Sequence, residues 1–213
     1  DRLDLMGIAS MLLNRRGNCS PAQSGIYRNL RTCVRHRKKL VAMSTEVKNR
    51  MHTVVDRLFP GFLNEKKSGI WSFSESSLYL MENRFSPHQI RRRKRKKLIE
   101  ILERCGTAQP ESTAAKLQEY AARVLNTPNE YIPTLQLSLA QHVKHLRCLQ
   151  DSIDQLEHEI AVWLAQTQGA FLTTFRGIGI VLAAGVSAEI GNPHEQAPLN
   201  NLGSYSGIIP RVK

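Results

Sequence analysis

The chain has no run of 18 or more apolar residues, and its longest apolar stretch, residues 178–190, is broken by glycines and a glutamate. A helix that crosses a bilayer needs about 20 predominantly apolar residues, so we expect no membrane partner. No positively charged segment precedes a short apolar one near the start, so we do not expect secretion either. The predicted location is the cytoplasm.

Cysteines and acidic residues are also few. The four cysteines, at positions 19, 33, 105 and 148, lie far apart without Cys-x-x-Cys spacing. This pattern argues against a zinc ribbon or a disulfide framework and favours reduced thiols.

The chain has only 18 Asp and Glu residues against 30 Lys and Arg residues, which gives a formal net charge of +12. We therefore expect a polyanionic partner, and charge alone does not separate DNA from RNA or from an anionic membrane surface, of which the membrane is the weaker choice.

Helical periodicity dominates the sequence. Apolar residues recur at steps of three and four over residues 26–58, until Pro60 and Gly61 end the pattern, which predicts one long helix. An unbroken seam over residues 131–167 predicts a coiled-coil helix, with His142 as its polar, register-setting position. Its partner is either the 26–58 helix or the same helix of a second chain in a homo-oligomer. The predicted fold class is mainly α, a helical bundle with a long antiparallel or dimeric coiled coil.

Two groups of basic residues are candidates for binding nucleic acid. One group lies on one face of the 26–58 helix, whose first half has no acidic residue: Arg28, Arg31, Arg35, Lys38 and Lys39. The other is a run of seven consecutive cations: Arg91, Arg92, Arg93, Lys94, Arg95, Lys96 and Lys97. Ser86 and Pro87 predict the start of a helix that carries this run, so its cations point to every side. Glu100 and Glu103 neutralise only part of it. The competing interpretation of the first group is a solvated helix face, and that of the seven-cation run is a nuclear import signal.

A third candidate site is a glycine-rich turn between two short apolar helical segments near the end of the chain. Its residues are Arg176, Gly177, Ile178 and Gly179. This pattern is typical of a helix-hairpin-helix, in which backbone N–H groups beside a helix N-terminus bind a phosphate of a nucleic-acid strand. An ordinary tight turn is the alternative. The small residues that follow, Ala183 to Gly185, allow another helix to come close.

The first helical turn carries Asp1 and Asp4, which lie on one face of a helix and present oxygen ligands that a divalent cation accepts. By themselves the two acids equally fit a favourable interaction with the helix dipole.

The order of these parts resembles one family. The parts are the Asp-x-x-Asp helix start, a basic helix that ends in Leu-Phe-Pro-Gly, a coiled coil, Phe-x-Gly-Ile-Gly, and Ser-Gly-Ile-Ile-Pro-Arg-Val. The chain is similar to the bacterial insertion-sequence transposases, or recombinases, of the DEDD and serine type in the IS110, IS116 and IS902 group. The resemblance implies a RuvC-like α/β domain with four acids that bind Mg²⁺, a serine nucleophile and, in some members, a guiding bridge RNA. Asp1 and Asp4 match the last two acids, and the serine is expected beyond Lys213.

We therefore expect an internal fragment, inactive alone, of an enzyme that cuts and rejoins DNA. Its predicted parts are a RuvC-like stub at 1–24, a basic helix at 25–61, a small helical unit at 62–127, the coiled-coil helix at 128–168, and the start of a transposase domain, with a strand near 207–212, at 169–213. The alternative function is a non-catalytic protein that binds nucleic acid and oligomerises.

Overall fold

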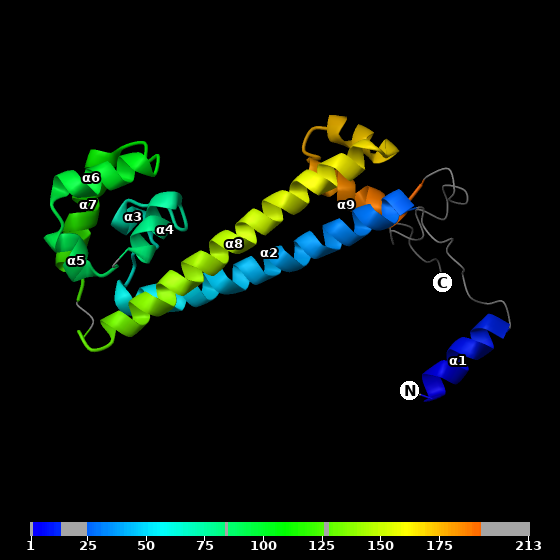
Figure 1. Ribbon diagram of the computed structural model, residues 1–213, viewed down its shortest axis with the longest axis horizontal. Coiled ribbons are helices and arrows are strands. Elements are labelled where there is room, and N and C mark those ends of the chain that lie inside the picture. The colour runs from blue at the N-terminus through cyan, green and yellow to red at the C-terminus, as the bar shows by residue number, and fades with distance from the viewer. Residues whose placement is uncertain (1, 14–24, 84, 126–127, 193–213) are drawn as a thin grey trace, which may run out of the picture. The chain divides into compact units, whose positions relative to one another are not determined.

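The computed structural model describes residues 2–13, 25–83, 85–125 and 128–192 (Figure 1). These residues form α-helices and one 3-10 helix, with no strand among them, which confirms the mainly α fold class. The strand expected near residues 207–212 lies outside this part of the chain. None of the described helices is long and apolar enough to cross a membrane.

The chain divides into two compact units. The first combines Asp1–His36 with Leu156–Lys213, and the second is Arg37–Gln155. The two long helices, α2 (Gly25–Leu58) and α8 (Ile132–Ala165), each contribute one part to each unit. The bounds of α2 confirm the long helix predicted over residues 26–58.

The first unit packs the beginning of α2, the end of α8 and α9 (Ile180–Ile190) around a small core. Ala183 and Ala184 are fully buried there, as their small size predicts, whereas Gly185 has open space around it. The 3-10 helix η1 (Gln168–Thr174) approaches α9 closely at Gly169. A Cβ atom at this position would lie 1.7 Å from Ser187 Oγ, so a larger residue would clash. Helix α1 (Arg2–Leu13) also falls within this unit.

The second unit adds five short helices to the remaining parts of α2 and α8. They are α3 (Glu65–Ser68), α4 (Glu75–Glu82), α5 (Pro87–Arg92), α6 (Arg95–Arg104) and α7 (Pro110–Arg123). Their shared core includes Phe59, Phe62 and Phe85, whose ring centroids lie 4.6–5.4 Å apart. Gly61 turns the chain after α2 at a φ of 72°, and a Cβ atom there would meet Tyr120 Oη at 2.4 Å.

The apolar seam of α8 packs within the chain in both units. None of the predicted seam residues is exposed: Ile132, Leu135, Leu139, His142, Leu146, Leu149, Ile153, Leu156, Ile160 and Trp163. In the second unit, Leu146 shares the core with Met51 of α2, and in the first unit Ile160 shares a cluster with Leu30. Within each unit the α2 and α8 segments lie side by side (Figure 1).

The seam differs from its prediction at one position. Val143, rather than His142, is fully buried. His142 is half-buried and its Nδ1 lies 2.6 Å from the carbonyl oxygen of Ser138, one turn earlier on its own helix. Val143 lies four residues after Leu139 and three before Leu146, so it also fits the spacing of three and four, and the seam continues at Leu146.

Candidate nucleic-acid interface

The seven-cation run does not lie on one helix, so the predicted continuous helix through residues 91–97 is wrong. Helix α5 ends at Arg92, Arg93 and Lys94 adopt extended ψ angles of 132° and 131°, and α6 begins at Arg95. The helix start at Ser86 and Pro87 is confirmed, because Ser86 Oγ accepts a hydrogen bond from the N–H of Gln89. Like charges one turn apart repel on a continuous helix, and the break separates them.

Packing explains where the break falls. Ile90 of α5 and Leu98 of α6 are both buried in the core of the second unit, and α7 packs against both helices. Gln118 of α7 stabilises the extended segment, because its Nε2 donates a hydrogen bond of 2.8 Å to the carbonyl oxygen of Arg93. The break is therefore set by contacts with α7.

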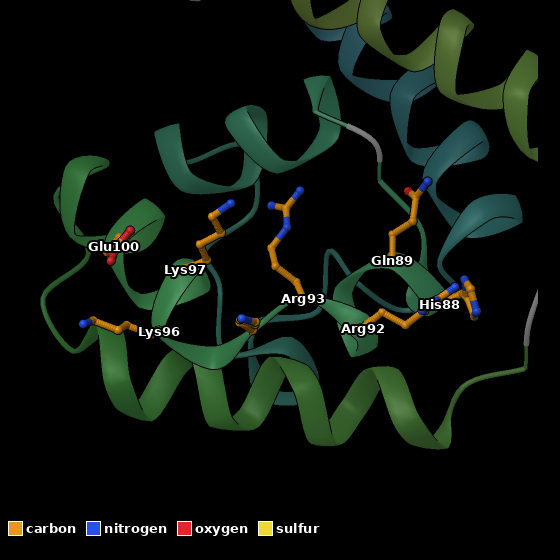
Figure 2. A pocket seen from close by; sticks show the side chains of 8 residues that line it. His88, Gln89, Arg92, Arg93, Lys96, Lys97 and Glu100 are labelled. Atoms are coloured by element: carbon orange, nitrogen blue, oxygen red, sulfur yellow. The ribbon is translucent and has the colours of Figure 1, made fainter.

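A concave pocket of about 770 Å³ opens at this break, and we call it the basic pocket. Its lining residues are His88, Gln89, Arg92, Arg93, Lys94, Lys96, Lys97 and Glu100. Figure 2 shows the side chains of Arg93, Lys97 and Gln89 extending in the same direction, whereas those of Arg92 and Lys96 leave on opposite sides. His88 and Gln89 were not predicted, and their sequence signal is their place three and two residues before the run.

The cations of the run form no ion pair among the described residues. Arg93 is half-buried and the other six cations are exposed. Of the two acids expected to offset part of the run, Glu100 lines the pocket beside the cations. Nη1 of Arg93 is buried without a hydrogen-bond partner. Because an unsatisfied buried donor is costly, an anion that accepts from this nitrogen would stabilise the pocket.

Two of the five basic residues predicted on α2 form ion pairs with another helix of the chain. Arg28, Lys38 and Lys39 are exposed. Arg35 Nη2 lies 3.0 Å from Oε1 of Glu189 on α9, and Arg31 also pairs with this glutamate. The first half of α2 contains no acidic residue of its own, and the acidic partner of these two arginines comes from a helix more than 150 residues later.

The glycine-rich turn at residues 176–179 connects η1 to α9 in the first unit. The segment before it is the 3-10 helix η1 rather than an α-helix, and Gly177 has a φ of 95°. Gly179 is the N-cap of α9, and no side chain caps the first N–H groups of this helix. Arg176 is exposed, whereas Ile178 packs against the core of the unit. The turn and the basic pocket belong to different units.

The predicted metal ligands are only partly described. Asp1 lies outside the described residues, and Asp4 is an exposed side chain in the first turn of α1. Within the described ranges no group of three His, Cys, Asp or Glu side chains is arranged to hold a metal ion. Mg²⁺ is bound through several arranged oxygen ligands, and of the two predicted ones this part of the chain presents Asp4.

The comparisons with known proteins connect the first part of the chain to one family. Residues 1–60 match the family model of the DEDD transposases of the IS110 type, described as "Transposase". The matched residues include α1 and α2, and the match confirms the resemblance predicted from the sequence. The basic pocket lies beyond them. No curated protein and no solved structure matches the chain.

Proposed function

We propose that this chain, an IS110-type transposase by its match over residues 1–60, holds DNA in the basic pocket while the intact protein cuts and rejoins DNA strands. One observation carries this proposal. The pocket presents uncompensated cations around an arginine whose buried Nη1 has no partner among the described residues. Phosphate oxygens are the acceptors that such a group of donors fits.

The proposed binding reads the backbone of DNA rather than its sequence. Arg93 is half-buried, its backbone carbonyl accepts from Gln118, and its guanidinium is proposed as the donor for one phosphate. The exposed lysines Lys96 and Lys97 supply charge that follows the backbone on either side. Contacts of this kind set position and affinity but do not select a sequence. Sequence selection is assigned to a guiding RNA, as the resemblance implies.

Two further groups are proposed to bind phosphates. Arg28, Lys38 and Lys39 are exposed on α2, and the uncapped N-terminus of α9 follows the turn at Arg176–Gly179. A helix N-terminus with free N–H groups favours an anion. Arg31 and Arg35 are also proposed to contact phosphates, although both form ion pairs with Glu189.

The chemistry of strand exchange is proposed from the family. A serine beyond this chain attacks a DNA phosphate, forms a covalent ester and releases the strand end, and a hydroxyl end later reverses the attack. Family membership suggests a divalent metal, which would stabilise charge at the reacting phosphate. Asp1 and Asp4 are proposed as two of its ligands. A homo-oligomer and a bacterial cytoplasmic location are proposed as well.

An assay of strand exchange tests the proposal. The intact protein that contains this chain is incubated with DNA carrying the ends of its insertion sequence and, separately, with bridge RNA added. Rejoined DNA is the result that supports a transposase. Binding without any rejoined product, with and without RNA, supports instead the alternative of a non-catalytic nucleic-acid-binding and oligomerisation protein, for which no catalytic cluster is needed.

A further inference from the structure

A loop of the second unit presents Trp71 to solvent. Trp71 is 70% exposed, although its neighbour Ile70 is only 3% exposed and lies in the core. An indole ring has a large apolar surface, and tryptophan is usually mostly buried. Trp71 does not line the basic pocket, and its exposure has no role in the function proposed above.

The loop that carries Trp71 is held by hydrogen bonds on both sides. Ser72 Oγ donates to the carbonyl oxygen of Leu63 at 2.5 Å, and Ser68 Oγ accepts from the N–H of Ile70 at 3.2 Å. The N–H of Ser74 donates to the carbonyl oxygen of Trp71 at 3.2 Å, which closes a tight turn. The indole is therefore attached to a fixed backbone.

Phe73, in the same loop, anchors it to the core of the second unit. Its φ of 57° lies in the left-handed region, which aromatic residues rarely adopt, so surrounding contacts must hold it there. Its ring packs against the core and meets the His52 ring at 5.2 Å with an interplanar angle of 72°. Lys48 Nζ lies 5.7 Å from the centre of the Phe73 ring. The contact with Lys48 places positive charge beside the loop.

The surroundings of Trp71 along the chain are polar and mostly basic. Its exposed neighbours in sequence include Lys66, Lys67 and Ser72. The nearby acids are Glu65, in the first turn of α3, and Glu75, whose carboxylate oxygens accept hydrogen bonds from Arg147. A protein partner needs a contiguous apolar patch of several hundred Å², whereas the exposed residues next to Trp71 in the sequence are polar. One flat apolar ring, with Lys66 and Lys67 close to it in the sequence and Lys48 at the neighbouring Phe73 ring, has the size and charge to receive one base and its phosphate.

We infer that Trp71 stacks on an unpaired base of a single-stranded nucleic acid, with Lys48, Lys66 and Lys67 attracting the adjoining phosphates. The inference rests on the proposed function in that the ligand is a nucleic acid, but it adds a second surface and a different form of ligand. Duplex DNA does not use this surface, because its bases are already stacked and paired. The base comes either from a DNA strand opened during exchange or from an RNA.

Tryptophan fluorescence tests the inference. The chain contains two tryptophans, Trp71 and Trp163, so the Trp163→Phe variant leaves Trp71 as the single indole. Stacking on a base quenches indole emission, and we expect saturable quenching with oligo(dT) or oligo(U) and none with a duplex at equal occupancy. Quenching by only one of the two strands identifies DNA or RNA as the source. Absence of quenching by both strands overturns the inference.

Affinity measurements provide the second arm. Trp71→Ala is expected to weaken single-strand binding about fivefold or more and to leave duplex binding unchanged, whereas Trp71→Phe keeps most of the affinity. Circular dichroism checks that both variants remain helical. Equal single-strand affinity of Trp71→Ala and the parent chain overturns the inference while the proposed function stands. If the parent chain binds neither single strands nor duplex, the proposed function fails as well.

Discussion

Arg31 holds the C-terminal end of α9 through Glu189. Its Nη2 donates to the carbonyl oxygen of Glu189 at 3.1 Å and lies 3.3 Å from the Oε2 atom of the same residue. Nε of Arg31 donates to the carbonyl oxygen of Ala188 at 3.0 Å. The last carbonyls of a helix lack partners within the helix and carry partial negative charge. Arg31 therefore joins two helices of the first unit, and its predicted contact with nucleic acid stays a prediction.

Removing this contact should destabilise the first unit. Arg31→Gln removes hydrogen bonds to helix-end carbonyls at a site that is less than one third exposed, so we expect a decrease of about 1–2 kcal/mol in the free energy of unfolding, measured with urea. Arg28→Gln is the matched control, because Arg28 is an exposed arginine one turn earlier, and its effect should stay within about 0.5 kcal/mol. Equal effects of the two substitutions would contradict the role of Arg31.

The break between α5 and α6 predicts that proline is tolerated at position 94. Lys94 has a φ of −57°, close to the proline value, and its N–H donates no hydrogen bond among the described residues. Lys94→Pro should therefore change the free energy of unfolding by less than about 1 kcal/mol. Glu100→Pro, inside α6, is the control and should cost about 3 kcal/mol or more. A decrease of about 3 kcal/mol for Lys94→Pro would indicate a continuous helix.

Local chemistry predicts the long helix and the helix start at Ser86, because periodicity and capping act within a few residues. The break at Arg93 is not predictable in this way, since arginine and lysine favour helices and the contact at the break comes from Gln118 of α7. The pairing of Arg35 with Glu189 joins residues 154 positions apart. Such contacts require knowledge of which helices pack together, so the basic run was found from sequence but its pocket was not.

The apolar seam of α8 should stabilise the fold of the single chain rather than join two chains. Leu146 is 4% exposed within the core of the second unit, so Leu146→Asp buries a carboxylate and should cost more than about 3 kcal/mol, measured by thermal and urea unfolding. Leu137→Asp is the control on the same helix, because Leu137 is 62% exposed, and it should change stability by less than about 0.5 kcal/mol. A Leu146→Asp protein that stays fully stable and only dissociates in sedimentation would show that the seam joins two chains.

Asp4 should matter for strand exchange but not for binding. In the intact protein, Asp4→Asn is expected to abolish rejoining of DNA ends and to leave DNA affinity nearly unchanged, because the basic residues supply most of the binding energy. Asp151→Asn, an exposed substitution on α8 with the same charge change, should exchange strands at the normal rate. Normal exchange by Asp4→Asn would return Asp4 to a simple interaction with the dipole of α1.

The dependence of DNA affinity on salt tests the central claim most directly. We compare the chain with a variant in which four lining residues of the basic pocket, Arg92, Lys94, Lys96 and Lys97, are replaced by Gln. A control variant replaces four cations elsewhere in the second unit, Arg50, Lys116, Arg123 and Lys144, and so has the same net charge. Duplex binding is measured between low and physiological salt.

The pocket variant should bind more weakly, and the slope of log affinity against log salt should flatten by about 0.9 for each DNA phosphate that the variant no longer neutralises. The control variant should keep a slope close to that of the parent chain. If the pocket variant and the control variant change affinity and slope equally, the pocket is not the DNA-binding surface and only the net charge attracts DNA.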